Sequence, residues 1–298
     1  MKLAIVVVYM VAEDHGGLLD LHLDRIARHT SVPYTIHGSA NRLAPEFRSV
    51  LASRPEVTLH DLEPTDLRGA AEHSWYLEQL VAHALADGAT HVATLHVDSF
   101  PAGDRWAETL AGRAGGTFAT IDGIGTACLL FPRTFHDRFR PRFQVADDIQ
   151  KSAAFEAFVR DCRPTLHSGV GYAFAAYENG LRWYSMPVTA ATGGPTGSFL
   201  YDDLVYHLQG AFRLAPREQE VNAALVERIG HRRFFGVLRM LRGATPAPLR
   251  RIARRLLRRP LAQVIDAPRE RWMAARMGSE MEKLLADPDG YIEELRGS

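Results

Sequence analysis

The chain has 298 residues, and its 35 lysines and arginines balance its 35 aspartates and glutamates, so the formal net charge is zero. This length suits one large α/β domain with an appendage, or two modest domains. With only two cysteines, Cys128 and Cys162, the composition excludes a disulfide framework and a zinc site made of thiolates. We therefore expect reduced thiols in a cytoplasmic protein.

Strand and helix patterns alternate from the amino terminus onward. The apolar run from Leu3 to Ala12 is too short for a membrane span and has no signal-peptide cleavage site, so it is predicted to hold the first buried strand. This alternation predicts an α/β fold with a mostly parallel central sheet flanked by helices. Further strands are expected at 33–37, 57–59, 90–98, 117–121, 127–131 and 182–186, and helices at 19–29, 44–52, 72–87, 104–111, 155–162 and 170–178. The Gly- and Thr-rich stretch 189–197 is predicted to be a flexible loop.

The stretch 90–101 organises the prediction, because it is an almost continuous apolar run that stops at Asp98 and then at Pro101. A strand that is apolar on both faces belongs inside a sheet covered by helices. The carboxyl edge of such a sheet is where α/β proteins bind ligands. Asp98 is therefore expected to face a metal or a phosphate-bearing ligand; the alternative is that it caps a following helix.

Common catalytic motifs are missing from the sequence. It has no phosphate-binding Walker loop, no His-Glu-x-x-His pair and no Gly-x-Ser-x-Gly elbow. The first strand is not followed by Gly-x-Gly-x-x-Gly, which argues against a Rossmann site for a dinucleotide or S-adenosylmethionine.

A combination of segments carries a family resemblance instead. Leu95-His96-Val97-Asp98-Ser99-Phe100-Pro101 resembles the Leu-Asp-Ser-Asp-Ala-Phe-Pro stretch of nucleotide-sugar glycosyltransferases with the GT-A fold, in a family-2-like form. The helix that begins at Glu72 is similar to their nucleotide-facing helix, and 204–213 is similar to their late segment with a metal-binding histidine. The resemblance covers roughly residues 3 to 213. It implies a GT-A-like glycosyltransferase domain at 1–214 and a basic helical extension at 215–298.

The resemblance also implies a site. In that family the Asp-x-Asp carboxylates hold Mn²⁺ or Mg²⁺, which bridges the diphosphate of the sugar nucleotide and offsets charge on the leaving group. The implied metal ligands here are Asp98, His207 and His96. The donor would be a nucleotide-diphosphate sugar, and the acceptor a glycan or a lipid-linked molecule. The residues implied in binding the nucleotide are Tyr9, Asn41, His73 and Arg213.

Two departures from the family pattern leave alternatives open. His96 stands where the family has its first acid, and imidazole binds Mn²⁺ but is a poor ligand for Mg²⁺ and carries no negative charge. Before the helix at 170–178 no acid occupies the place of the catalytic base, so the candidates are His167, whose ordinary pKa suits the role, and the Asp147-Asp148 pair. Such departures also fit a GT-A-like protein that binds a nucleotide or glycan without catalysis. A related nucleotidyltransferase is a further alternative.

A charge asymmetry lies towards the end of the chain. Between residues 228 and 265 there are eleven arginines and no acid. One hypothesis is that 231–259 forms an amphipathic element on the anionic inner face of a membrane, which would suit a lipid-linked acceptor. The alternative is a helical appendage whose apolar face packs on the core. Nucleic acid is not expected as a partner, because aromatics for base stacking are missing from 250–259.

Overall fold

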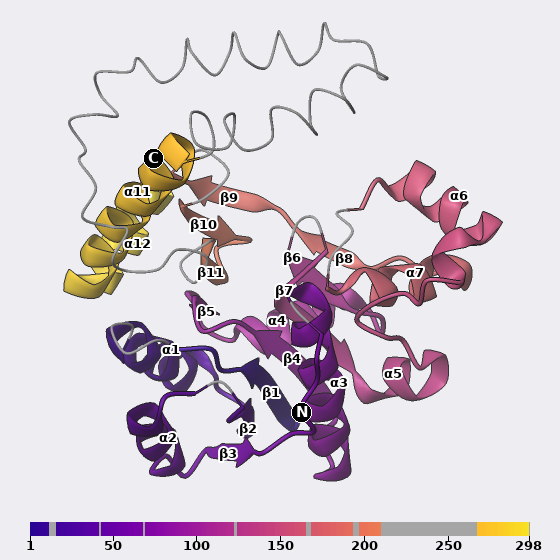
Figure 1. Ribbon diagram of the computed structural model, residues 1–298, viewed down its shortest axis with the longest axis horizontal. Helices are drawn as coiled ribbons and strands as arrows, with labels where there is room; N and C mark the ends of the chain where they lie inside the picture. The colour runs from indigo at the N-terminus through magenta and orange to yellow at the C-terminus, as the bar shows by residue number, and fades with distance from the viewer. Residues whose placement is uncertain are drawn as a thin grey trace, which may run out of the picture.

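A computed structural model describes residues 1–11, 16–41, 43–67, 69–121, 124–164, 168–192, 197–209 and 267–297. Its central sheet has seven strands in the order β3-β2-β1-β4-β7-β6-β8 (Figure 1). Those strands are β1 (Leu3–Val8), β2 (Tyr34–Ser39), β3 (Val57–His60), β4 (His91–Leu95), β6 (Ala119–Ile121), β7 (Gly125–Pro132) and β8 (Tyr184–Met186). Four of the six neighbouring pairs are parallel, and the two that involve β7 are antiparallel. The predicted mostly parallel sheet flanked by helices is confirmed.

Helices cover both faces of this sheet because its strands are apolar on both sides. Along β1, Leu3, Ile5 and Val7 enter one core with α1, α2 and α4. The alternate residues of β1 enter a second core with α3, α5, α6 and α7. The helices of the two layers are α1 (Gly16–His29), α2 (Pro45–Ala52), α3 (Ala70–Ala86), α4 (Trp106–Ala114), α5 (Arg133–Phe139), α6 (Ala153–Cys162) and α7 (Val170–Glu178), with a short 3-10 helix η2 (Ile149–Lys151) before α6.

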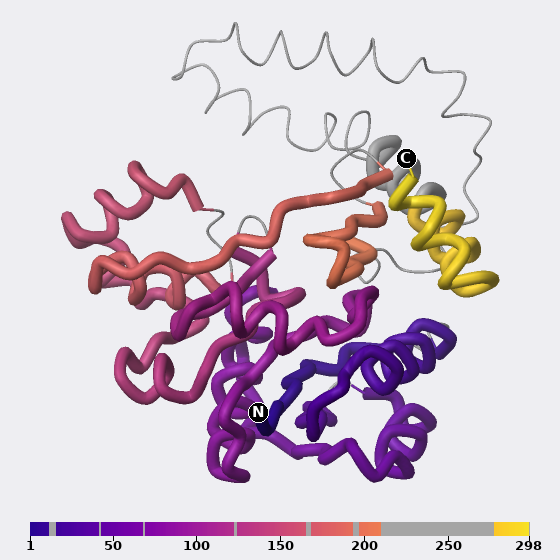
Figure 2. The backbone as a smooth tube through the Cα atoms, turned by 180° about the vertical axis from the view of Figure 1, so that it is seen from behind, coloured from indigo at the N-terminus to yellow at the C-terminus, as the bar shows by residue number. Residues whose placement is uncertain are grey.

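A second sheet stands beside the first and is antiparallel throughout, in the order β5-β11-β10-β9. Its strands are β5 (Ser99–Pro101), β9 (Val188–Ala191), β10 (Gly197–Tyr201) and β11 (Val205–Gln209). The C-terminal helices α11 (Ala267–Ala286) and α12 (Pro288–Gly297) lie next to this sheet and to α1, as the views from both sides show (Figures 1 and 2). Leu18, Phe100 and Leu284 belong to the third core that these elements enclose.

The prediction of one strand over 90–98 was wrong at its end. β4 stops at Leu95, and a turn follows in which the Ser99 backbone N–H donates to the His96 carbonyl at 3.0 Å. Beyond this turn the chain enters the second sheet as β5, so the apolar run serves two sheets in succession. The alternative role of Asp98 as a helix cap is also wrong, because the next helix begins only at Trp106.

Two smaller differences concern short elements. The stretch predicted as a loop from residue 189 begins inside β9, which is held by pairing with β10. Helix α5 was not expected, because its seven residues are too few to show a clear helical period.

Several predictions fall outside the described residues. They concern His167, Arg213, the domain boundary at 214/215 and the basic segment 231–259. Within the part of the chain that the structure describes, no helix combines the length and the apolar character needed to cross a membrane.

Candidate metal centre

Asp98 lies in the turn between the two sheets. The Ser99 side chain shapes this turn, because its hydroxyl accepts from the His96 backbone N–H at 2.8 Å. Asp98 itself is only 5% exposed, and its carbonyl accepts from the Leu208 backbone N–H at 2.8 Å. The carboxylate is thus held by backbone contacts on a buried turn at the carboxyl end of β4.

Strand β11 brings His207 to the same place. It pairs with β5 so that His207 lies opposite Ser99, one residue after Asp98. The His207 Nε2 atom is 3.6 Å from Asp98 Oδ1, and the His207 side chain is buried. Two residues far apart in the sequence therefore meet where the two sheets join.

His96 completes a group of three. Its Nδ1 is 3.8 Å from Asp98 Oδ1, and its ring is 5.9 Å from the His207 ring at 79°. One ligand atom from each of the three residues lies within 4.8 Å of the others, a spacing that can hold a metal ion. This donor set of two imidazoles and one carboxylate fits a transition metal better than Mg²⁺, which prefers oxygen ligands.

The other side of the His96 ring contacts the Thr126 hydroxyl, which in turn contacts the Ser168 hydroxyl. Its Nε2 lies 3.1 Å from Thr126 Oγ1, and Thr126 Oγ1 lies 3.0 Å from Ser168 Oγ. Thr126 sits near the start of β7 and Ser168 just before α7, and both are buried. Sequence reasoning missed Thr126 as part of the site; a lone hydroxyl in an apolar strand was the only signal.

His73, which is predicted to face the nucleotide, lies beside His96. It comes from the first turns of α3, and its ring meets the His96 ring edge-on at 4.9 Å and 83°. Burial lowers the pKa of His73 to about 4, so its imidazole is neutral at pH 7. It therefore adds no positive charge that would repel a cation at Asp98.

Tyr9 and Asn41, also predicted to bind the nucleotide, are engaged in the fold. Tyr9 is fully buried, and its ring lies across Gly38 of β2. The Asn41 side chain donates to the Leu62 carbonyl at 2.8 Å and accepts from the Leu62 N–H at 3.1 Å, which joins the chain beyond β2 to the chain beyond β3. These contacts support the fold, and nucleotide binding by Tyr9 and Asn41 stays a prediction.

Asp148, one of the candidate bases, is exposed. It precedes η2, and its side chain makes no capping hydrogen bond there.

Comparison with known proteins finds no family model and no curated protein that matches the chain. Similar solved structures include the glycosyltransferase GlyE of Streptococcus pneumoniae TIGR4, with 10% identity over 62% of this chain and 45% of GlyE, at a TM-score of 0.36. They also include the galactosyltransferase LgtC in complex with donor and acceptor sugar analogs, with 12% identity over 62% of this chain and 73% of LgtC, at 0.36. A putative nucleotide-diphospho-sugar transferase from Desulfovibrio desulfuricans G20 aligns with 11% identity over 63% of this chain and 80% of its own, at 0.38. The chain spans less than half the length of GlyE, and likeness at this level identifies neither a donor nor an acceptor.

Proposed function

We propose that the chain is a metal-dependent glycosyltransferase that moves a sugar, of hexosyl type, from a nucleotide-diphosphate donor to a glycan or lipid-linked acceptor in polysaccharide biosynthesis. The observation that carries the proposal is the meeting of Asp98 and His207 at 3.6 Å, with His96 beside them. Their sequence segments are the ones that resemble the metal-binding segments of GT-A glycosyltransferases.

Each residue of the group has a separate part in this proposal. Asp98 would supply the negative charge. It lies on a buried turn that backbone hydrogen bonds hold in place. His207 and His96 would contribute neutral nitrogen donors through Nε2 and Nδ1, the atoms that face Asp98. A divalent cation held there would supply positive charge that offsets the negative charge building up on the donor diphosphate as the sugar leaves.

We further propose Mn²⁺ as the cation and keep two candidates for the base that takes the acceptor proton. Nitrogen donors favour Mn²⁺ over Mg²⁺, because Mg²⁺ prefers oxygen ligands and gives up its bound water reluctantly. His167 and Asp148 remain the candidate bases. Both precede α7 in the sequence: His167 stands where the family pattern has its carboxylate, and Asp148 lies nearby in the sequence beside Asp147.

The proposal is tested by thermal unfolding with uridine or guanosine diphosphate, with and without Mn²⁺. A ligand that binds only the folded protein, at about 100 times its Kd, stabilises it by about 2.7 kcal/mol. With nucleotide and Mn²⁺ we expect the unfolding temperature of the wild type to rise, and with Mg²⁺ to rise less. Asp98→Asn keeps the size of the side chain but loses its charge, so its unfolding temperature should not rise. The control is Asp137→Asn, which removes a surface acid of α5 paired with Arg133. An Asp98→Asn protein that still shows the full Mn²⁺-dependent rise would refute the proposal.

One observation favours a second function, a protein that binds a nucleotide sugar without catalysis. His96 replaces a carboxylate, so a cation would be held by a single negative charge among the three donors. Transfer assays with a panel of nucleotide sugars distinguish the two functions. Tight Mn²⁺-dependent binding with no turnover of any donor would favour the binding protein, and turnover would exclude it.

A further inference from the structure

The second sheet has the candidate metal centre on one face and the C-terminal helices on the other. Along β11, His207 points to the centre, while its neighbours Tyr206 and Leu208 enter the third core. Phe100 of β5 enters the same core and stacks on Tyr206 at 4.9 Å and 21°. The strand that carries His207 and the strand that follows Asp98 are therefore packed on their other face by α11 and α12.

A cluster of polar side chains, most of them buried, joins the C-terminal helices to the second sheet. The Ser198 hydroxyl of β10 lies 2.6 Å from the Tyr206 hydroxyl and 2.8 Å from the Tyr291 hydroxyl of α12. It also donates to Glu280 of α11 at 3.2 Å, and Tyr291 donates to the same carboxylate. Because Ser198, Tyr206 and Tyr291 are buried, loss of any one of these partners would leave polar groups inside the protein without their bonds.

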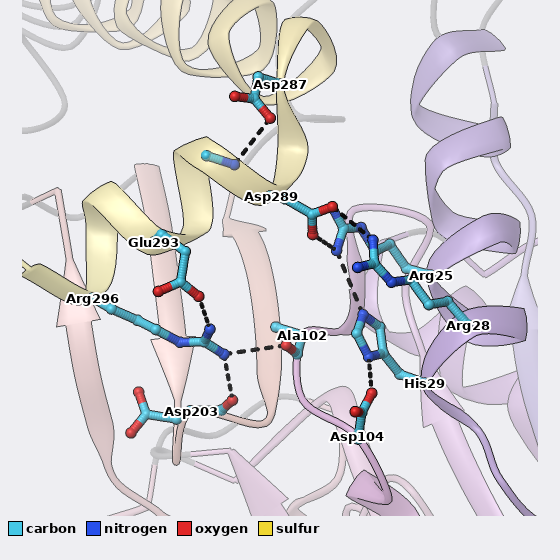
Figure 3. Close-up of polar contacts among 11 residues, drawn as sticks. Arg25, Arg28, His29, Ala102, Asp104, Asp203, Asp287, Asp289, Glu293 and Arg296 are labelled. Carbon is cyan, nitrogen blue, oxygen red and sulfur yellow. Dashed lines mark hydrogen bonds and ion pairs between the residues drawn. The ribbon is translucent and has the colours of Figure 1, made fainter.

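Arg296 of α12 connects the end of β5 with the start of β11. Its Nη2 donates to the Ala102 carbonyl at 3.2 Å and to the Asp203 carbonyl at 3.1 Å (Figure 3). Ala102 follows β5, and Asp203 lies in the turn just before β11. One guanidinium therefore connects the strand that follows Asp98 with the strand that carries His207.

The position of β11 against β5 decides the geometry of the centre. His207 faces Asp98 only because it lies opposite Ser99 in the pairing of these short strands. Since β5 has three residues, few ladder hydrogen bonds oppose a shift of β11 along it. Contacts that hold both strand ends from outside the sheet therefore contribute more to the register of β11 against β5 than they would in a long strand pair.

We infer that α11 and α12 are a positioning element of the metal centre, acting through Arg296 and through the cluster of Ser198, Tyr206, Glu280 and Tyr291. This inference rests on the proposed metal binding by Asp98 and His207. It makes cation affinity depend on side chains at the end of the chain that do not touch the cation.

The test uses the full-length protein and measures Mn²⁺ binding by calorimetry, beside the unfolding temperature. Arg296→Gln removes the bonds to both strands, and Tyr291→Phe removes only a hydroxyl from the cluster. We expect each to lower Mn²⁺ affinity about tenfold, the lower end of what outer residues contribute to metal sites. The matched control is Asp289→Asn, which weakens the ion pairs of α12 with Arg25 and Arg28 of α1 at 2.6 Å but touches neither β5 nor β11 (Figure 3). It should lower the unfolding temperature and change the affinity less than twofold.

A double-mutant cycle separates positioning from general stability. In a protein that already carries His207→Ala, Arg296→Gln should cause no further loss of Mn²⁺ affinity, because the ligand that it positions is gone. Wild-type affinity in Arg296→Gln, or an equal loss in Asp289→Asn, would overturn the inference while leaving the metal centre intact. A wild-type protein that binds no Mn²⁺ would overturn the proposed metal site and this inference with it. Should Tyr291→Phe fail to fold, Arg296→Gln still decides, since that side chain is partly exposed.

Discussion

His96 is contacted through both of its ring nitrogens. Nδ1 faces Asp98 at 3.8 Å, and Nε2 lies 3.1 Å from the Thr126 hydroxyl. A neutral imidazole carries one proton, so a hydrogen bond from Nε2–H to Thr126 leaves the lone pair on Nδ1, the nitrogen on the side of Asp98 and His207. We expect the Thr126 hydroxyl to favour the tautomer in which Nε2 donates to it, because His96 can then bind a cation through Nδ1.

A substitution at Thr126 tests this selection. Thr126→Val removes the hydroxyl and keeps the branched shape, and we expect Mn²⁺ affinity to fall by about 10- to 100-fold, as for other partners of metal-binding histidines. Calorimetric titration measures the change. Thr120→Val is the control, because Thr120 is equally buried but its hydroxyl donates to the Gly125 carbonyl at 3.0 Å. Equal affinity in the wild type and Thr126→Val would show that Thr126 does not set the tautomer.

The residues of the site differed in how far sequence could reveal them. Asp98 and His207 stood in segments that resemble a family, and the structure brings them together. Thr126 could not be found in this way, because its role depends on the antiparallel pairing of β7 with β4, which sets the two strands side by side. His73 was linked to the nucleotide, but its contact with the His96 ring depends on the rotation of α3 about its axis.

At the scale of the elements, the close packing of β1 on β2 depends on one glycine. A Cβ atom at Gly38 would lie 2.5 Å from Cε2 and 2.7 Å from Cδ2 of the Tyr9 ring. Tyr9 is fully buried, so its ring cannot swing out to solvent without leaving the core. The Tyr9 ring, which follows β1, is thus packed directly over a residue of β2 that has no side chain.

Gly38→Ala is expected to lower the free energy of unfolding by about 1 to 3 kcal/mol, the usual effect of overpacking a core. Urea unfolding followed by circular dichroism measures it. Gly112→Ala is the matched control: Gly112 lies in α4, and an added Cβ there would meet nothing within 4 Å. Because alanine favours a helix over glycine, this control should raise the unfolding free energy by about 0.5 to 1 kcal/mol. A neutral effect of Gly38→Ala would mean that Tyr9 can shift after all.

Long elements with a clear period were predictable, and short ones were not. The helix expected at 72–87 is α3 (Ala70–Ala86), where Leu77, Leu80 and Val81 are buried at helical spacing. β5 and β9 have three and four residues, too few to show an alternation, and they become strands only by pairing with β11 and β10. Their structure is decided by distant parts of the chain.

At the scale of the whole molecule, the end of the chain closes the third core. Met277, Leu284 and Ile292 of α11 and α12 pack there with Leu18 of α1 and Leu208 of β11. An appendage that packs on the core was one of the two interpretations of the C-terminal region, although it was drawn from the arginine-rich segment and not from these helices. The prediction followed the charge composition of that segment, whereas the apolar residues between 277 and 295 are the ones that pack α11 and α12 on the third core.

The folded protein also holds several histidines in their neutral form. Burial lowers the pKa values of His22, His37 and His73 to about 4, with the charge of the neighbouring His60 ring adding to the effect at His37. In the unfolded chain a histidine titrates near 6.5. Between these values the unfolded chain binds more protons than the folded protein, so the free energy of unfolding falls as the pH falls from about 6.5 to about 4.

His22 offers the clearest test of this acid sensitivity. It is fully buried in α1, and its Nδ1 lies 3.0 Å from the Ser99 carbonyl. Its Nε2 has no hydrogen-bond partner among the described residues, so a second ring proton would have no acceptor there. With a pKa near 4 in the folded protein, His22 alone should remove roughly 2 kcal/mol of unfolding free energy between pH 7 and pH 5. In His22→Asn, whose amide can still donate to the Ser99 carbonyl, that part of the loss should vanish. Urea unfolding at the two pH values measures the difference, and between pH 7 and pH 8.5 both proteins should change in parallel. An equal loss in both proteins from pH 7 to pH 5 would show that His22 is not a source of the acid sensitivity.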